Sequence, residues 1–304
     1  MRILLIAGGW SNEREVSLSG SRSIRAALER LGHEIIFLDP GSQFHDLPAL
    51  AGKADFAFIN LHGCPGEDGL IQALLDRLGC PYQGSGPSGS LLALNKCAAK
   101  ELFVHHRIPT PNWEYIPLAP GDAWSCSLHF PLFVKPNNGG SSLDVSQVDT
   151  REALAAPLAS LVAKGCEVLL EEAVPGQEIT CAILGSEPLP PILIQPADRS
   201  GFFDYYSKYT PQAAQEICPA PISRQLTATI QDLALRAHKC LGLCDYSRAD
   251  FMVQGEEPYL LEVNTLPGMT ATSLFPQAAQ AVGLSFDQLM TRLIELGSRS
   301  SKLE

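Results

Sequence analysis

Short apolar runs alternate with helix-like spacing over the first 90 residues. Residues 3–7 form a continuous apolar run that ends at two glycines, which predicts a buried strand. Apolar residues then recur at i, i+3, i+4 and i+7 from Ile24 to Leu31, the period of an amphipathic helix, which Gly32 ends. The same patterns predict strands over residues 34–38 and 55–60 and a helix over residues 70–78. Strands that alternate with helices pair in parallel and bind ligands at their carboxyl ends.

The pattern changes after a glycine- and serine-rich segment at residues 84–89, where we expect a boundary. A helix is predicted over residues 90–105, and from residue 130 onward closely spaced strands indicate α+β structure with antiparallel pairing. The predicted elements are strands over 130–135, 167–171, 178–184 and 192–195, helices over 151–162 and 223–241, a hairpin of 245–253 and 259–264, and a last helix from about Pro276. Residues 197–221 form a long polar, tyrosine-rich connection, which is typical of an active-site lid.

Composition and charge exclude some classes of function for this protein. With 304 residues, 45% of them hydrophobic, the chain is long enough for two or three domains with a sizeable core. The net charge is -11 and no block of lysine or arginine occurs, so we expect no nucleic-acid partner. No apolar run approaches the roughly 18 residues of a membrane span, so we expect no membrane insertion. The nine cysteines form no C-x-x-C pair and are interpreted as reduced thiols of a cytoplasmic protein.

The hairpin near the C-terminus carries a set of oxygen ligands. Glu262 and Asn264 are two residues apart on one strand, so both point to the same face, and Asp250 on the partner strand reaches that face too. Two carboxylates and an amide oxygen suit Mg²⁺, which completes its shell with water and phosphate. Arg248, also on this face, fits a place where negative charge gathers. The alternative is an ordinary strand with a surface salt bridge.

A lysine and a glycine-serine loop follow the strand predicted over residues 130–135. Lys135 ends this apolar strand, which is costly unless it has an anionic partner. The loop of residues 137–142, Asn-Asn-Gly-Gly-Ser-Ser, lets backbone N–H groups approach an anion such as phosphate. It is not a P-loop, because the lysine precedes the glycines. The alternative is a flexible turn beside a snorkelling lysine.

Two further candidates follow strands of the N-terminal part. His62 stands where the third predicted strand ends, and Glu13, shortly after the first strand, offers a carboxylate for a substrate ammonium group. A capping or core histidine and a solvated acid in the first turn of a helix are the alternatives. A dehydrogenase is excluded because G-x-G-x-x-G is absent. Aromatic residues with one lysine at 202–209 fit a lid that shields a reactive intermediate from water.

The order and spacing of these motifs resemble the D-alanine–D-alanine ligases, which are ATP-grasp enzymes, over roughly residues 3–290. The motifs that carry the resemblance are Glu13-Arg14-Glu15-Val16-Ser17, His62-Gly63-x-x-Gly66-Glu67-Asp68-Gly69, Lys96, Lys135-Pro136 before Gly140-Ser141-Ser142, Glu171 to Glu178, Asp204-Tyr205 with Lys208-Tyr209, Arg248-Ala249-Asp250, and Glu262 to Thr270. The resemblance implies a Rossmann-like parallel-sheet domain followed by a two-subdomain ATP-grasp fold with antiparallel sheets. The expected divisions are a substrate domain at residues 1–90, a central ATP-grasp subdomain at 91–175, and a C-terminal subdomain with the lid and the magnesium site at 176–304.

The resemblance also implies a reaction and a set of site residues. ATP would phosphorylate one D-alanine, and the amine of a second would attack the acylphosphate, giving a dipeptide for peptidoglycan synthesis. Two Mg²⁺ ions, with Mn²⁺ as an alternative, a cytoplasmic location and a homodimer are expected. The implied ATP ligands are Lys96, Lys135, Lys208, Glu171, Glu172, Val174 and Glu178, and the implied metal ligands are Asp250, Glu262 and Asn264. The implied substrate and catalytic residues are Glu13, His62, Ser141, Tyr209, Arg248, Gly268, Ser273 and Leu274.

Two positions depart from the family pattern, and the substrate leaves alternatives open. Leu143-Asp144 stands where the family usually has Val-Gly, which brings an extra acid near the phosphate loop, and Gln147 stands where lysine is common. D-lactate or D-serine as the second substrate is one alternative. A non-catalytic ATP-grasp binding module is another, although the intact set of lysines and acids speaks against it.

Overall fold

The N-terminal part of this computed structural model is built on a parallel sheet, as the sequence predicts. The structure describes residues 1–117, 119–121, 124–140, 144–196, 214–270 and 272–299. Strands β1 (Arg2–Ala7), β2 (Glu34–Leu38) and β3 (Phe56–Asn60) pair in the order β2-β1-β3. All residues of β3, and all of β1 after Arg2, are buried, because helices cover a parallel sheet on both faces.

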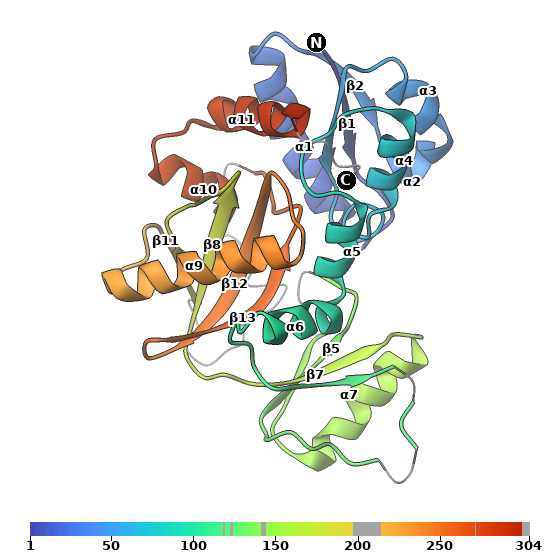
Figure 1. The fold of residues 1–304 in the computed structure, drawn as a ribbon. Helices are drawn as coiled ribbons and strands as arrows, with labels where there is room; N and C mark the ends of the chain where they lie inside the picture. The colour runs from blue at the N-terminus through green and yellow to red at the C-terminus, as the bar shows by residue number, and fades with distance from the viewer. Residues whose placement is uncertain (118, 122–123, 141–143, 197–213, 271, 300–304) are drawn as a thin grey trace.

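Helices from both ends of the chain enclose this sheet. They are α1 (Arg14–Arg30), α2 (Pro40–Gln43), η1 (Phe44–Asp46), α3 (Leu47–Ala51), α4 (Leu70–Leu78) and α11 (Phe286–Arg299). Helix α10 (Leu274–Ala281) instead contacts α11 and the strand β8 (Gln177–Leu184). The C-terminal helix α11 lies against α1, and both flank the sheet in Figure 1. Leu289 and Leu293 of α11 belong to the same core as the strands. The end of the chain thus returns to the N-terminal sheet, while the divisions at residues 90 and 175 stay predictions.

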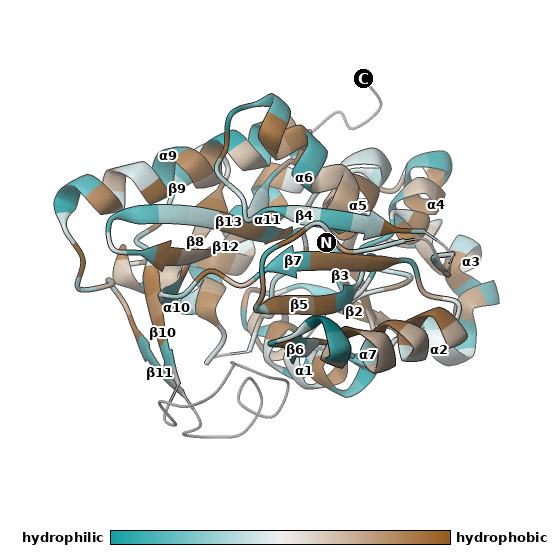
Figure 2. Ribbon diagram, turned by 90° about the horizontal axis from the view of Figure 1, so that it is seen from below, coloured by the Kyte–Doolittle hydropathy of each residue, from teal (hydrophilic) through white to brown (hydrophobic). Residues whose placement is uncertain are grey.

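The central part is an antiparallel sheet with one helix. Strands β4 (Trp113–Ile116), β5 (Leu132–Pro136), β6 (Ser146–Val148) and β7 (Val168–Glu172) pair in the order β4-β7-β5-β6. Alternation along the strands turns Leu132, Val134 and Leu170 to the core with α7 (Arg151–Ala163). Hydrophobic residues predominate along β5 (Figure 2). Lys135 and Glu171 therefore lie on the opposite face, the one turned away from α7.

The C-terminal sheet carries the predicted hairpin. Its strands β8 (Gln177–Leu184), β9 (Glu187–Pro188), β10 (Ile192–Pro196), β11 (Ala214–Ile217), β12 (Tyr246–Gln254) and β13 (Glu257–Asn264) are ordered β11-β10-β8-β12-β13, with β9 beside β8. Helix α9 (Arg224–Cys240) packs on this sheet. Strand β11 falls inside the connection predicted over residues 197–221, so that loop was predicted too long. No helix in the described part of the chain is long and apolar enough to cross a membrane.

Two helices were predicted wrongly as single elements. The helix expected over residues 90–105 is divided into α5 (Pro87–Leu94) and α6 (Lys96–His105). Asn95 between them is extended, with ψ 97°, and its side chain accepts from Ala98 N at 2.9 Å. Asn95 therefore caps a new helix instead of continuing the old one, since a side chain that accepts from the first turn replaces a helical hydrogen bond. The last helix is also divided, into α10 and α11, with Gly283 between them at φ +86°.

Candidate active site

The glycine loop after β5 is fixed to the start of helix α6. The side chain of Asn137, which is fully buried, accepts from Cys97 N at 2.9 Å, and the Asn137 carbonyl accepts from Lys96 N at 3.1 Å. Asn138 forms a bridge with Asn95. These contacts satisfy donors that a helix N-terminus leaves open. They place the loop beside Lys96, as expected for a phosphate cradle that takes its cation from another element.

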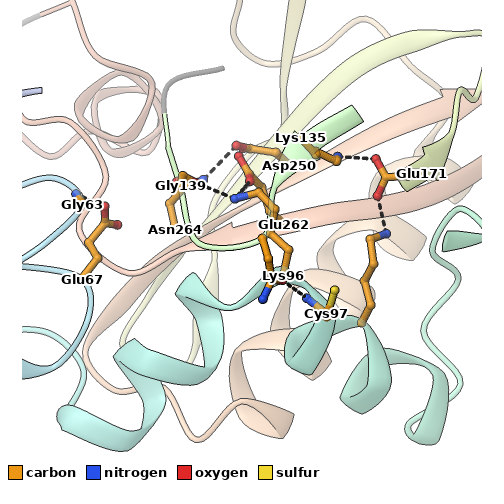
Figure 3. Close-up of polar contacts among 12 residues, drawn as sticks. Gly63, Glu67, Lys96, Cys97, Lys135, Gly139, Glu171, Asp250, Glu262 and Asn264 are labelled. Atoms are coloured by element: carbon orange, nitrogen blue, oxygen red, sulfur yellow. Dashed lines mark hydrogen bonds and ion pairs between the residues drawn. The ribbon is translucent and has the colours of Figure 1, made fainter. Parts of the chain in front are cut away.

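Lys96 connects the loop to the C-terminal sheet. Its ammonium group donates to the Gly139 carbonyl and lies 3.2 Å from Glu262 Oε2 (Figure 3). A cation in the first turn of a helix is repelled by the positive end of the helix dipole, and an anionic partner offsets this repulsion. The structure brings together two predicted residues that are 166 positions apart, one for phosphate and one for metal.

Lys135 has the anionic partner that its strand-end position requires. Its ammonium group donates to Glu171 Oε1 (Figure 3), and Lys100 Nζ lies 2.5 Å from the other oxygen of the same carboxylate. Burial works to raise the pKa of Glu171, but the two lysines outweigh it and hold this pKa below its ordinary value. Sequence reasoning missed Lys100, although its i+4 spacing from Lys96 places both on one face of a helix.

The predicted metal residues of the hairpin also meet. Arg248 pairs with Asp250 through Nε to Oδ1 at 2.8 Å and Nη2 to Oδ2 at 2.7 Å, and Asn264 Nδ2 donates to Oδ2 at 2.9 Å. Thr180 Oγ1, on the neighbouring strand β8, donates to Oδ1 at 2.7 Å. Burial works to lower the pKa of Arg248, but the Asp250 carboxylate outweighs it and the pKa lies above its ordinary value. The alternative of a surface salt bridge does not fit, because this ion pair is largely buried.

These residues fit a sparse magnesium site. Among the described residues no three His, Cys, Asp or Glu side chains come together as a metal site. Mg²⁺ does not require such a cage, because it commonly takes one or two carboxylates and completes its shell with water and substrate phosphates. Asp250, Glu262 and Asn264 supply oxygen donors of this kind. A carboxylate offers about four lone-pair positions, and all four of Asp250 already accept hydrogen bonds, so one donor has to leave before a metal is bound.

Glu13 and His62 lie on the N-terminal side of the same loop. Both are buried, and a Cβ placed on Gly140 would lie 2.7 Å from Glu13 Oε2. Burial lowers the pKa of His62, and the Glu13 carboxylate opposes this shift. Ser11 Oγ donates to the His62 carbonyl at 2.7 Å, which ties the two segments together. Glu13 is therefore adjacent to the phosphate loop, where an amino-acid substrate would meet ATP.

Glu67 links this region to the segment after β13. Its carboxylate accepts from Gly63 N at 2.8 Å and from Leu266 N at 3.4 Å. Burial, together with the charge of Glu13, raises the pKa of Glu67 to about 7. Glu67 belongs to a motif that carries the family resemblance, but the sequence alone assigned it no role. Its contacts hold the segment after β3 and the segment after β13 together.

The predicted oxyanion and second-substrate residues lie in the segment that follows. A Cβ on Gly268 would lie 2.9 Å from Ser273 Oγ, so the Gly268 backbone and this hydroxyl are neighbours. Ser273 Oγ also accepts from Thr270 N at 3.0 Å. Leu274 begins α10 directly after it. The structure thus clusters these residues, while their contacts with substrate stay predictions.

Of the other predicted positions, Glu172 is turned away from the cleft, Glu178 lies on the same face of its sheet as Asp250, and several lie outside the described residues. Glu172 accepts from Asn112 Nδ2 and from His129 N, both at 2.8 Å, on the face opposite Glu171. Val174 follows β7, and Glu178 lies on β8 across from Met252. Asp144 pairs with Lys164 at 2.6 Å, on the side of α7, which answers the concern that it opposes ATP. Gln147 lies on β6. Ser141, Lys208, Tyr209 and the aromatic segment 202–209 lie in the parts of the chain that the structure does not describe.

Known proteins resemble this chain over almost its whole length. A family model described as "D-ala D-ala ligase C-terminus" matches residues 111–295. A D-alanine--D-alanine ligase of Oleidesulfovibrio alaskensis is 59% identical over 298 residues, covering 98% of this chain and 96% of the relative. One from Nitratidesulfovibrio vulgaris strain DP4 is 56% identical, with 98% of each chain covered. Two solved structures of D-alanine--D-alanine ligase from Bacillus anthracis, one complexed with ATP, superpose with TM-scores of 0.85 and 0.86 at 33% and 35% identity, with 98% of each chain covered.

Proposed function

The chain belongs to the D-alanine–D-alanine ligase family, and we propose that the cleft described above is the site of its reaction. It has the ATP-grasp fold of that family and joins two D-alanine molecules into D-alanyl-D-alanine, a precursor of peptidoglycan. In our proposal the carboxylate of one D-alanine takes the terminal phosphoryl group of ATP and ADP leaves. The amine of the second D-alanine then attacks this acylphosphate, so that an amide bond forms, phosphate leaves and the amine loses a proton.

The lysines of the cleft are proposed to hold the phosphates of ATP. Lys96 on α6 contacts the glycine loop, and Lys135 on β5 contacts Glu171. Lys208, which lies outside the described residues, would join them. Phosphoryl transfer depends mostly on positioning and on charge stabilisation, which clustered cations supply. The backbone from Glu171 to Val174 is proposed to meet adenine, since the Glu171 side chain is occupied by lysines. Glu178 is proposed to bind the ribose.

Mg²⁺ is proposed to bind at Asp250, Glu262 and Asn264, with two ions expected from the family and Mn²⁺ as a substitute. When bound, it would neutralise phosphate charge during transfer. Glu262 is already beside Lys96, so the metal ligand and a phosphate ligand share one corner of the cleft. Release of Arg248 from Asp250 would free an oxygen for the metal and the guanidinium for the reacting carboxylate.

The amino-acid substrates are proposed to bind on the N-terminal side of the loop. Glu13 would pair with the ammonium group of the first D-alanine, and His62 lies next to it. Arg248 and the Gly268 N–H would stabilise the oxyanion of the tetrahedral intermediate, as donors do in other acyl transfers. Ser273 and Leu274 would contact the second D-alanine. Ser141 and Tyr209 are proposed to link this site to the lid, which keeps water from the acylphosphate.

One observation supports this proposal most strongly: the glycine loop lies between the two binding functions. Gly139 accepts from Lys96, and the next residue, Gly140, borders Glu13. A phosphate held by the loop is therefore close to an amino acid held by Glu13, as transfer between them requires. This juxtaposition joins the N-terminal part of the chain to the part expected to form the central subdomain. It speaks against a module that only binds nucleotide.

The proposal is tested by phosphate release with ATP, Mg²⁺ and D-alanine, with D-lactate, D-serine and L-alanine in parallel, and by mass spectrometry of the product. We expect turnover with D-alanine and a product containing an amide. An ester with D-lactate would reassign the second substrate, and no turnover with any D-substrate would refute the enzyme. Lys135→Ala and Glu262→Ala are each expected to lose most of the turnover.

A cytoplasmic location and a homodimer complete the proposal. The reaction consumes ATP, which is supplied in the cytoplasm, and fractionation of cells tests the location. The homodimer is expected from the family alone, and light scattering on the purified protein tests it. A monomeric mass at micromolar concentration would contradict the dimer without affecting the reaction.

A further inference from the structure

Lys100 is a fully buried lysine to which the proposed reaction assigns no role. It lies one turn after Lys96 on α6, and its side chain has no exposed surface. A buried ammonium group is costly unless it is paired and hydrogen-bonded. Its Nζ lies 2.5 Å from Glu171 Oε2 and donates to Thr110 Oγ1 at 2.5 Å. Lys100 is therefore held in a defined place behind the cleft.

The contacts of Lys100 reach the C-terminal sheet. Thr110 Oγ1 donates to the Leu260 carbonyl of β13 at 2.7 Å, and Leu260 N donates to the Pro109 carbonyl at 2.8 Å. Strand β13 carries Glu262 two residues later. The chain of contacts thus runs from the proposed metal strand through Thr110 and Lys100 to Glu171 and Lys135. It joins the two sheets that would enclose ATP.

The charges of this cluster do not cancel. Lys100 and Lys135 share the single carboxylate of Glu171, so with both lysines protonated the three side chains together carry one positive charge. Burial lowers the pKa of Lys100, and the Glu171 carboxylate opposes this shift. The side chain of Lys135 is 13% exposed, whereas those of Glu171 and Lys100 are 2% and 0% exposed. Lys135 is the member of the cluster nearest to solvent. The excess charge is therefore presented at the cleft.

We propose that Lys100 is a positioning residue for ATP binding: it occupies one oxygen of Glu171, so that this carboxylate orients Lys135 without neutralising it. Without Lys100, Lys135 and Glu171 would form a simple neutral pair and attract a phosphate more weakly. Because Lys100 and Lys135 share the Glu171 carboxylate, Lys135 is held in one position and its positive charge stays available to the phosphates of ATP. This inference rests on the proposed binding of ATP phosphates by Lys135.

Nucleotide binding to the purified full-length protein, measured by calorimetry without D-alanine, tests the proposal. Lys100→Met keeps the length of the side chain and removes its charge, and we expect the Kd for ATP to rise about tenfold, the order expected for one charge-assisted contact. The Kd for adenosine is expected to stay unchanged, because adenosine has no phosphate. Adding Glu171→Gln to the same chain frees Lys135 from its carboxylate. The double variant is expected to bind ATP within about threefold of the wild type.

A purely structural role gives different results. Loss of packing would weaken ATP and adenosine alike, and a second substitution in the same cluster would not restore binding. The proposal is overturned if Lys100→Met binds ATP as tightly as the wild type, or if the double variant binds as weakly as the single one. If the single variant does not fold, the double variant decides, because its cluster keeps the single positive charge of the wild-type cluster: a tenfold loss of ATP affinity refutes the proposal.

Two further variants complete the test. Lys53→Met removes an exposed lysine far from the cleft and is expected to bind ATP like the wild type. Lys135→Met separates this inference from the proposed function. If it binds ATP normally, Lys135 is not a phosphate ligand. If it weakens ATP binding while Lys100→Met does not, only the role of Lys100 fails.

Discussion

Arg248 holds Asp250 by two parallel hydrogen bonds, Nε to Oδ1 at 2.8 Å and Nη2 to Oδ2 at 2.7 Å. The residue proposed to stabilise the oxyanion is therefore bound to a residue proposed to hold magnesium. Such a bidentate pair is among the strong hydrogen-bonded contacts in proteins. Asp250 offers an oxygen to a metal ion only after a donor leaves, and Arg248 is the donor with a second proposed task. Metal binding and oxyanion stabilisation are thereby linked.

Arg248→Met tests this link by two independent measurements. We expect kcat to fall about 100-fold or more, as when an oxyanion donor is removed. We also expect Mn²⁺, titrated without nucleotide and followed by electron paramagnetic resonance, to bind several-fold more tightly, because its competitor for Asp250 is gone. Arg25→Met, which removes an exposed arginine paired with Glu29, is the control and should change neither quantity. Weaker Mn²⁺ binding in Arg248→Met would contradict the competition.

Thr180 is predicted to position Asp250. Its hydroxyl donates to Asp250 Oδ1 at 2.7 Å from the adjacent strand. Thr180→Val keeps the shape of the side chain and removes this donor, so we expect the Mg²⁺ concentration for half-maximal activity to rise about tenfold, within the range for groups that orient metal ligands. The matched control is Thr229→Val on α9, where the half-exposed hydroxyl donates to the Gln225 carbonyl one turn earlier at 3.0 Å. An unchanged Mg²⁺ requirement would remove Thr180 from the site.

Local sequence signals predicted most of the elements, and long-range pairing explains those they missed. The apolar runs at β1 and β3 and the helical period of α1 predicted the N-terminal sheet, because burial on both faces leaves a continuous pattern. Strand β11 was missed because its Ala-Gln-Glu-Ile sequence gains its strand conformation by pairing with β10. The break at Asn95 was missed because apolar residues continue across it. A capping asparagine decided that local structure.

Residue types pointed to candidate ligands of the site more readily than to the side chains that support them. Asp250, Glu262 and Asn264 were predicted as metal ligands because their period along two strands is visible in the sequence, and the structure brings them near one another. Lys100 and Thr180 were not, since their roles depend on burial and on partners about 70 residues away in the chain. A lysine at i+4 from Lys96 is ordinarily read as a solvated helix residue. Only the fold shows that it faces Glu171.

Glu67 is predicted to make stability depend on pH. Burial and the charge of Glu13 raise its pKa in the folded state to about 7, above the ordinary value of 4.5. A carboxyl group with a raised pKa favours the folded protein below pH 4.5, and this contribution is lost as pH rises through 7. Glu67→Gln cannot ionise, so its Tm relative to the wild type should increase between pH 5 and pH 8. A Tm difference that is constant over this range, measured by differential scanning fluorimetry, would contradict the shift.

The contact between Gly140 and Glu13 gives a test of the junction between the two substrates. A Cβ on Gly140 would lie 2.7 Å from Glu13 Oε2, closer than real Cβ contacts allow. Gly140→Ala must therefore displace either the carboxylate or the phosphate loop. We expect kcat/KM for D-alanine to fall about tenfold or more, because small misplacements of reacting groups are costly. The measurement is steady-state phosphate release at saturating ATP.

The control for this substitution lies in the same part of the chain. A Cβ on Gly121 would have no heavy atom of the described residues within 4 Å, and this glycine has no left-handed backbone, so Gly121→Ala adds the same methyl group with no clash among these residues. It should leave both kinetics and Tm unchanged. A shift of the loop alone would weaken ATP binding in Gly140→Ala, whereas displacement of Glu13 would raise the KM for the first D-alanine and spare ATP binding. Because Glu13 Oε2 is the nearest of the described atoms, we expect a raised KM for the first D-alanine with unchanged ATP binding. Normal D-alanine kinetics in Gly140→Ala would show that Glu13 does not border the substrate.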